Sequence, residues 1–393
     1  MKQCWRWFGP NDAITLTELH QAGVEGIATA LYDLPAGIAW GRQNLLPTQD
    51  MLRAHGYAWD VVDCLPVSEA IKTQTGDMAA HIEAYKQSLK AIAGQGISTV
   101  CYSFSPVFDW TRTNLRAQHT HGGTSMLFQM VEFAVFDLFI LKRDGACEAY
   151  SEGCIAQAQA RFDAMSEEEK SSLQSSVLAG LPHAYQGANL DELRALIETY
   201  ATITPEKLRA NLIDFLSEVA PIAQEFGVNL GCHPDDPPFS LLGLPKVVSS
   251  YADYAAIFGA VDIPANGAVL CTGALGVCAD FDGPAFVRRH GARIHFAHLR
   301  NTTRLDSADA TKPDFYEAAH LEGNTDIVGT VRALMDEQRR RKEAGRDDWV
   351  IPMCADHGQE LLSDLGRPHS AGSPLIGRMR GLAELRGIIA ACA

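Results

Sequence analysis

The stretch EKLRANLIDFLSEVAPIAQEFGVNLGCHP, residues 206–234, contains the structural unit from which the fold can be deduced. Its apolar residues first recur at three- and four-residue spacing, which predicts a helix that ends at Gly227. A short apolar run follows at once and predicts a buried strand that ends at His233. A helix that leads directly into a buried strand is typical of parallel α/β sheets.

The same unit recurs along the whole chain. Similar apolar runs, several of them preceded by helical patterns such as residues 80–96, give eight candidate strands. Eight alternating strands and helices predict a (β/α)8 TIM barrel rather than a doubly wound sheet. No Gly-x-Gly-x-x-Gly motif follows the first run, which disfavours a dinucleotide-binding domain. The runs are 4–8, 26–32, 58–67, 96–104, 227–234, 267–273, 293–300 and 349–358.

The connection between the fourth and fifth runs, residues 105–205, is far longer than one helix of a barrel requires. Residues 161–182 within it have a helical pattern, with Ser166 as the N-cap and Glu169 completing a capping box. We therefore expect a single barrel domain over residues 1–393 that carries a mostly helical insertion, 105–205, at its catalytic face.

Composition narrows the class of partner. The chain has 393 residues, of which 47% are hydrophobic and 21% charged, and its formal net charge is −15. An acidic protein is a poor ligand for nucleic acid or an anionic membrane, so an anionic substrate would need a local positive site such as a metal or arginines. No signal-peptide pattern or bilayer-length apolar run is visible, and the ten cysteines form no Cys-x-x-Cys pair. These features predict a cytoplasmic protein with reduced thiols that acts on a small molecule.

Potential metal ligands stand at the ends of the last four predicted strands. His233 ends the fifth strand, Cys271 the sixth and His298 the seventh, while Asp356 follows the eighth. Each residue alone has an ordinary explanation, as a hydrogen-bonded histidine, a core cysteine or a helix cap. However, the catalytic groups of a TIM barrel lie at the carboxyl ends of its strands. Nitrogen, sulfur and oxygen ligands that converge there predict a site for a first-row divalent metal.

The segment HPDDPP, residues 233–238, follows the first of these ligands. Its three prolines fix the backbone, so we expect Pro234–Pro238 to be extended and to hold His233 in place. Asp235 or Asp236 can orient the second ring nitrogen of that histidine. Alternatively, both carboxylates cap the next segment or face water, and the sequence does not decide between these interpretations.

With these residues in view, the chain resembles the mannonate dehydratase family, whose members are metal-dependent enzymes with a xylose-isomerase-like TIM barrel. The resemblance extends over nearly the whole chain, and the combination of FDWTR with HPDDPP is specific to it. The matching segments are WRWFGPND (5–12), CYSFSPVFDWTRT (101–113), HPDDPP (233–238), GLPKVVS (243–249), CTG (271–273), HLRNT (298–302), EAAHLEGNTDI (317–327) and DHG (356–358).

The resemblance implies a reaction and a cofactor. It implies dehydration of D-mannonate to 2-keto-3-deoxy-D-gluconate in hexuronate catabolism, with Mn²⁺ or Fe²⁺ bound and a homo-oligomeric assembly. It places the metal ligands on His233, Cys271, His298 and Asp356, and the catalytic histidine on His357. As a hypothesis, protonated His357 donates a proton to the leaving hydroxide.

Three further residues are expected to position the substrate. Arg300 lies two residues beyond His298, where it can hold the substrate carboxylate as a catalytic partner. The alternative for Arg300 is a salt bridge across the barrel rim. Trp110 and Arg112 are expected at the rim around the substrate, with core packing as the alternative for Trp110.

The resemblance also suggests residues that close over the site. Tyr316, Glu317 and His320 fall in a matching segment that we interpret as a loop covering the substrate, so Tyr316 and His320 are candidate substrate-binding residues. Tyr102, near the end of the fourth predicted strand, is another.

Five positions depart from the family pattern, and all of them flank strand ends. Ser373 stands where the family has a tyrosine that transfers protons, and serine cannot replace a phenol as a base without help. The others are Cys354 for an arginine, Ser103 for an asparagine, Ser68 for a histidine and Asp63 for a glutamate. Either neighbours such as Tyr102 or Tyr316 compensate, or the barrel acts on a related sugar acid, or it catalyses a slow reaction.

Two other functions remain open at the level of sequence. A metal-dependent sugar isomerase or epimerase uses the same barrel, although it favours carboxylates that bridge two metals, whereas this set includes a thiol. A non-catalytic relative that binds a sugar acid would explain the altered polar residues, but the complete ligand set and His357 argue against it.

Overall fold

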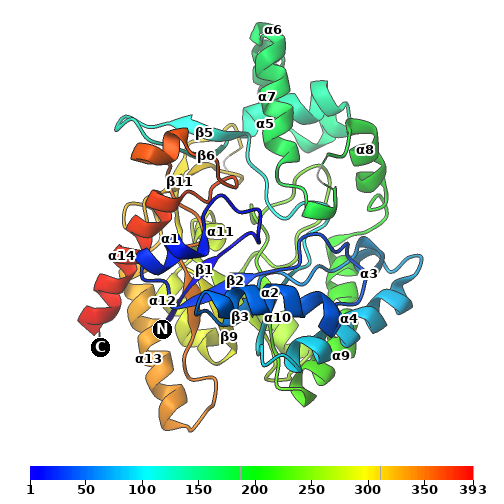
Figure 1. Ribbon diagram of the computed structural model, residues 1–393. Coiled ribbons are helices and arrows are strands. Elements are labelled where there is room, and N and C mark those ends of the chain that lie inside the picture. Colours follow the sequence, from blue (N-terminus) through cyan, green and yellow to red (C-terminus); the bar gives the residue numbers. More distant parts are fainter. Residues whose placement is uncertain (186, 310, 393) are drawn as a thin grey trace.

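The computed structural model describes residues 1–185, 187–309 and 311–392, and within them eight parallel strands close into a barrel (Figure 1). The order around the barrel is β1-β12-β9-β8-β7-β4-β3-β2. Each predicted run overlaps one barrel strand, so the predicted TIM barrel is confirmed. The strands are β1 (Lys2–Arg6), β2 (Gly26–Thr29), β3 (Trp59–Val62), β4 (Thr99–Ser103), β7 (Asn229–His233), β8 (Asn266–Cys271), β9 (Ile294–His298) and β12 (Pro352–Cys354).

Amphipathic helices surround the barrel, and α9 (Pro205–Glu225) shows why they form. Thr204 caps its first turn, Pro205 occupies a position where no backbone donor is needed, and Gly227 follows it with a positive φ of 69°. Its buried residues recur every three or four positions and face the barrel. The other surrounding helices are α1 (Leu16–Gln21), α2 (Arg42–Ala54), α3 (Glu69–Thr73), α4 (Met78–Ala93), α10 (Tyr251–Ala260), α11 (Thr272–Gly276), α12 (Gly283–His290), the short η4 (Gly291–Arg293), α13 (Ile327–Glu343), η5 (Leu362–Gly366) and α14 (Leu375–Cys392). None of the helices in the described residues has both the length and the apolar character of a membrane span.

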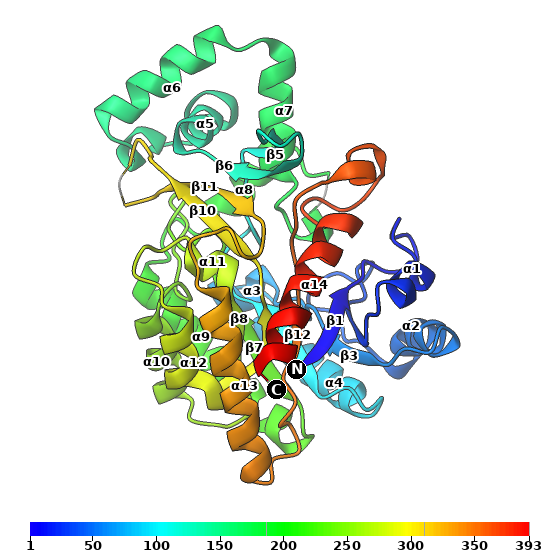
Figure 2. The same ribbon diagram turned by 90° about the vertical axis from the view of Figure 1, so that its left-hand side faces the viewer.

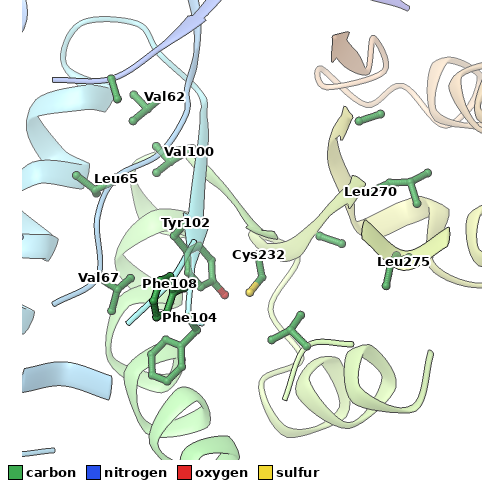
Figure 3. Close-up of a cluster of buried hydrophobic side chains, with 14 of the residues drawn as sticks. Val62, Leu65, Val67, Val100, Tyr102, Phe104, Phe108, Cys232, Leu270 and Leu275 are labelled. Atoms are coloured by element: carbon green, nitrogen blue, oxygen red, sulfur yellow. The ribbon is translucent and has the colours of Figure 1, made fainter. Parts of the chain in front are cut away.

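Strand alternation separates two cores. Successive side chains of a strand point to opposite faces, so each barrel strand contributes to the interior and to the layer beneath the helices. Small residues and Phe296 fill the interior, where Cys4, Cys101 and Cys354 form one buried cluster with Ala28, Val61 and Val269. Tyr102 points the other way, into the larger core under the helices, and its ring faces the Cys232 sulfur (Figure 3).

The insertion, residues 105–205, contains helices and also a β-hairpin that the sequence analysis did not predict. Its strands β5 (Asn114–Gln118) and β6 (Thr124–Phe128) join β10 (Asn301–Leu305) and β11 (Asp314–Ala318) in an antiparallel sheet of order β10-β11-β6-β5. The sheet lies between the insertion helices and the barrel (Figure 2). The helices are α5 (Met130–Val135), η1 (Phe136–Leu141), η2 (Ala146–Ala149), α6 (Glu152–Ala164), α7 (Glu167–Leu178), η3 (His183–Tyr185) and α8 (Leu190–Glu198).

One local prediction made from the sequence is confirmed, and two others are wrong. Ser166 and Glu169 form the predicted capping box of α7. The segment after β7 is not fully extended, because it bends from Asp236 onward. Tyr316 and Glu317 do not lie on a loop, since both belong to strand β11, where the antiparallel pairing with β10 holds them.

Candidate metal centre and active site

A cavity of about 860 Å³ opens at the carboxyl ends of β1, β2, β3, β4 and β12. Insertion residues from α7 and η3 form part of its wall, which places the insertion at the face of the barrel where chemistry is expected. Its lining includes Arg6, Tyr32, Trp110, Tyr185, His357 and Ser373.

The predicted ligands come together in two groups that share one histidine. His233, Cys271 and His298 form the first group, in which one ligand atom from each residue lies within 4.8 Å of the others. His298, Cys354 and Asp356 form the second group by the same criterion. The structure therefore brings three predicted ligands together directly, and it connects Asp356 to them through His298, whose Nδ1 lies 3.5 Å from Oδ2 of that carboxylate.

Strand register explains this convergence. Cys271 on β8 is paired with His298 on β9, and His298 is paired with Cys354 on β12. Residues paired in neighbouring parallel strands point to the same face of the sheet, so the three side chains stand side by side. Asp356 lies two residues beyond Cys354 with a φ of 53°, a left-handed backbone conformation unusual for a residue other than glycine.

Electrostatics favour the ionised forms of Cys271 and Asp356 at neutral pH. Burial disfavours the thiolate, yet the charges of Arg300 and His233 together lower the pKa of Cys271 to about 5. Burial also opposes ionisation of Asp356, but His298 and His357 hold the pKa of that carboxyl well below its usual range.

The buried polar atoms of the group also fit a cation. Within the described part of the chain, neither ring nitrogen of His298 has a hydrogen-bond partner, although its side chain is 1% exposed. The Oδ1 atom of Asp356 is likewise buried without one. Such atoms are costly to bury unless something binds them, and nitrogen, sulfur and carboxylate donors suit a divalent transition metal.

Besides Cys354, two charged residues at the site were not among the predicted site residues. Asp63, one residue beyond β3, places its Oδ2 3.6 Å from Nε2 of His298. Arg6, the last residue of β1, lies 3.5 Å from Asp63 and 3.8 Å from Asp356. Applying the strand-end rule to the first four strands as well as the last four would have found both.

Arg300 forms salt bridges within the protein, which the sequence analysis gave as the alternative to a contact with the substrate. Its guanidinium is buried and pairs with Asp236 and with Glu317, the latter at 2.6 Å, while its Nε lies 3.2 Å from Asp356. Arg112 is also fully buried and contacts the same Asp236 and Glu317, at 2.7 and 2.6 Å. Both arginines thus belong to one buried ion-pair network, in which carboxylates of the protein already pair with them.

The two aspartates of HPDDPP also differ from expectation. Asp236 belongs to this network, and Asp235 accepts hydrogen bonds from the backbone N–H groups of Val247 and Val248. Both are buried, so neither faces water. Nδ1 of His233 lies 2.7 Å from the carbonyl oxygen of Pro234, so this backbone group, not a carboxylate, orients the ring.

Among the predicted substrate-binding residues, Trp110 lines the cavity, whereas Tyr102, Tyr316 and His320 make other contacts. Trp110 is half-buried and lines the cavity. Tyr102 is a correction, because strand alternation turns it into the core against Phe215, with ring centroids 5.8 Å apart. Tyr316 packs on His119 of the insertion at 5.0 Å. His320 is buried, with Nε2 3.0 Å from the carbonyl oxygen of Ala355.

His357 lines the cavity beside the metal-ligand groups. Its Nε2 lies 3.4 Å from Oδ2 of Asp356. Burial is the main reason that its pKa is lowered to about 4, although Asp356 opposes this. Gly372, with a φ of 68°, packs so closely that a Cβ there would lie 2.2 Å from Nδ1 of His357. The imidazole is therefore held in place and is neutral at pH 7, in contrast to the protonated acid of our hypothesis.

A phenol that the sequence analysis did not single out also lines this cavity. Tyr32 lies three residues beyond β2, and its hydroxyl donates to the carbonyl of Trp7 at 3.3 Å. Burial raises its pKa to about 12, although Arg6 opposes the effect, so the phenol keeps its proton at neutral pH. Ser373, at the departure from the family pattern, lines the same cavity.

The fold and the site define a class. A xylose isomerase-like TIM barrel protein from Mycobacterium smegmatis, solved in complex with magnesium, matches with a TM-score of 0.51 at 11% identity, covering 96% of this chain and 88% of that one. This likeness concerns the fold alone. Together with the buried donor groups, it describes a xylose-isomerase-like barrel with a site for a divalent metal ion.

The sequence comparisons name the family. The family model described as D-mannonate dehydratase (UxuA) matches residues 1–393. A mannonate dehydratase of Rhizobium meliloti is 47% identical over 388 residues, covering 99% of this chain and 96% of that protein. The crystal structure of mannonate dehydratase from Streptococcus suis serotype2 matches with a TM-score of 0.76 at 29% identity, covering 100% of this chain and 93% of that one. The chain belongs to the D-mannonate dehydratase family of hydro-lyases, and the resemblance seen in its motifs is confirmed.

Proposed function

We propose that this protein dehydrates D-mannonate to 2-keto-3-deoxy-D-gluconate. One observation carries the proposal: His357 lines a cavity directly beside a buried group of histidine, cysteine and aspartate ligands, in a chain of the D-mannonate dehydratase family. The reaction removes a proton next to a carboxylate and expels the neighbouring hydroxyl, so it needs a cation and at least one group that transfers a proton.

We propose His233, Cys271, His298 and Asp356 as the residues that hold the cation, Mn²⁺ or Fe²⁺. A divalent cation at this place would stabilise the negative charge that develops on the substrate carboxylate. The thiol in this set argues against a sugar isomerase of the type in which carboxylates bridge two metals.

Arg6 is better placed than Arg300 to meet the substrate. Arg300 lies in a network with Asp236, Glu317 and Asp356, whereas the Arg6 side chain is 26% exposed and lines the cavity. We therefore assign the substrate-carboxylate contact to Arg6, and we assign to Arg300 the positioning of Asp356 through its Nε.

Two groups are proposed to move protons. The neutral ring of His357 can accept a proton at Nε2, and it can then donate that proton to the leaving hydroxyl. The phenol of Tyr32, which also lines the cavity, is the second group. It offers a hydroxyl that can transfer a proton in a chain that has Ser373 at the position of the family tyrosine. Trp110 forms part of the cavity wall.

The test is turnover of a defined substrate. Mn²⁺-loaded protein with D-mannonate should produce 2-keto-3-deoxy-D-gluconate, and Cys271→Ala should abolish the product. Cys232→Ala is the matched control, because Cys232 is a similarly buried cysteine that belongs to the core under the helices, beside Tyr102. Metal binding without turnover of D-mannonate would contradict the proposal, and a panel of other aldonates and ketoses would then identify a related dehydratase or an epimerase.

A cytoplasmic location and a homo-oligomeric state remain predictions. Light scattering on the purified protein tests the assembly, and cell fractionation tests the location.

A further inference from the structure

We propose that Cys354 is a metal ligand, and that together with His298 and Asp356 it offers a second position for a divalent cation beside the one at Cys271. The inference depends on the metal centre proposed above and not on the identity of the substrate. It concerns a residue that departs from the family pattern, so it describes a property of this chain.

Geometry carries the proposal. Ligand atoms of His298, Cys354 and Asp356 all lie within 4.8 Å of one another, and all three side chains are buried. Cys354 is paired in register with His298 and belongs to the cluster of the barrel interior, while Asp356 follows two residues later, beyond the end of β12, with a left-handed backbone. Strand register therefore positions His298 and Cys354, and the Nδ1 atom of His298 lies 3.5 Å from Oδ2 of Asp356.

A second observation indicates that something binds there. In the described residues, both nitrogens of His298 and Oδ1 of Asp356 are buried without a hydrogen-bond partner. A histidine has two ring nitrogens, and those of His298 face different carboxylates: Nε2 lies 3.6 Å from Asp63, and Nδ1 lies 3.5 Å from Asp356. The Nδ1 side of the ring is thus the side that faces the second triad.

Two simpler explanations for Cys354 are weaker. As an ordinary core residue it would resemble Cys101, which lies in the same interior cluster but joins no potential metal-binding group among the described residues. A disulfide with Cys271 is disfavoured by strand spacing. The two residues lie on either side of His298, which places their Cα atoms roughly 9.5 Å apart, beyond the range of a disulfide.

The proposal has a consequence for metal selectivity. A position built from one thiolate, one imidazole and one carboxylate favours softer cations such as Co²⁺, Zn²⁺ or Cd²⁺ over Mn²⁺, because Mn²⁺ prefers oxygen ligands. Cys354 should therefore contribute more to the affinity for Cd²⁺ than to the affinity for Mn²⁺.

Co²⁺ titration of the full chain tests the proposal, because a thiolate bound to Co²⁺ gives a charge-transfer absorption band. The variant Cys271→Ser removes the first thiol, and it should still bind Co²⁺ with a thiolate band. The double variant Cys271→Ser/Cys354→Ser should lose that band, whereas the matched control Cys271→Ser/Cys101→Ser should keep it. Circular dichroism establishes that each variant is folded.

The outcomes separate the inference from the proposed function. A Co²⁺-bound Cys271→Ser variant with no thiolate band would overturn the role of Cys354 and leave the metal centre intact. Failure of the wild-type protein to bind Co²⁺ or Mn²⁺ would overturn the metal centre itself.

A second measurement covers the case in which Cys271→Ser does not fold. Cys354→Ser alone should weaken Cd²⁺ binding by at least about tenfold and Mn²⁺ binding less, since even losses outside the direct ligands cost about that much. Equal Cd²⁺ affinity in Cys354→Ser and Cys101→Ser would overturn the inference.

Discussion

His298 is the residue on which the site is centred. It contacts both ligand groups, and its ring lies between Asp63 and Asp356. Burial opposes its charge, yet Asp356 and the other anions around it raise its pKa well above the usual range. A buried imidazolium so strongly favoured by anions occupies a place where a metal cation can substitute for the proton.

Tyr32 provides a test of proton transfer at the scale of one side chain. Tyr32→Phe removes a hydroxyl that lies in the cavity while keeping the ring packed on Phe8 at 5.8 Å. We expect kcat on D-mannonate to fall by about 10²-fold or more, within the range usual for a general acid or base, with metal affinity unchanged. Steady-state kinetics across pH measures this effect.

Tyr185→Phe is the matched control, because Tyr185 also lines the cavity but lies on the insertion. Equal kcat and an unchanged pH profile in Tyr32→Phe and the wild-type protein would assign proton transfer to His357 alone.

At the scale of elements, buried ion pairs join three segments of the chain. Arg112 precedes β5, Asp236 follows β7, and Glu317 belongs to β11, so this network fastens the insertion and the small sheet to the barrel. The arginine also lies over the ring of Phe315, 4.6 Å from its centroid.

Arg112→Met keeps much of the volume of the side chain and removes its charge. We expect the free energy of unfolding to fall by about 3–5 kcal/mol, because two buried carboxylates lose a partner. Urea denaturation measures the change. Arg161→Met is the control: Arg161 is 35% exposed and pairs with Glu132 on the surface, so we expect a loss of at most about 1 kcal/mol. Equal losses in the two variants would contradict this account of the network.

The same network predicts how stability depends on pH. Burial opposes ionisation of Asp236 and Glu317, but Arg112 and Arg300 hold the pKa of both carboxyls below their usual values. A carboxyl whose pKa is lower in the folded state stabilises the fold above its unfolded pKa of about 4, and this contribution is lost as the pH falls through the folded pKa.

Unfolding free energies of the metal-free protein should therefore decrease from pH 5 to pH 3. Arg112→Met should show a shallower decrease, because Asp236 and Glu317 have already lost one of their two arginine partners in that variant. A decrease of equal slope in both proteins would assign the acid sensitivity to other groups.

At the scale of the whole molecule, a cation held by the proposed ligands would couple several barrel strands to one another. The proposed ligands come from β7, β8, β9 and the segment after β12, on one side of the closed barrel. A cation that binds only the folded state adds stability according to its concentration and affinity, about 2.7 kcal/mol at a hundred times the dissociation constant.

Removing the metal should therefore lower the melting temperature by a few degrees. Differential scanning calorimetry with Mn²⁺ and with EDTA measures the shift. Cys271→Ala should show a much smaller difference between the two conditions, and an equal difference would place the stabilising ion elsewhere.

The sequence by itself determined the barrel, all eight of its strands, the capping box at Ser166 and the family. These features depend on local periodicity, on side chains that hydrogen-bond nearby backbone, and on short motifs, and all of them can be read along the chain. It also predicted that His233, Cys271, His298 and Asp356 would converge, because parallel strands end at one face of a barrel.

Only the tertiary structure decided how the remaining side chains are used. Strand alternation directs Tyr102 into the core, and burial among carboxylates engages Arg300 and Arg112. The hairpin β5–β6 was missed because β5 alternates between exposed and half-buried positions and gains its partner only from β6 of the insertion sheet. Register between the two neighbouring strands β9 and β12 places Cys354 beside His298. Apart from the hairpin, whose strands are neighbours in sequence, these facts depend on contacts between residues distant in sequence, which local patterns do not encode.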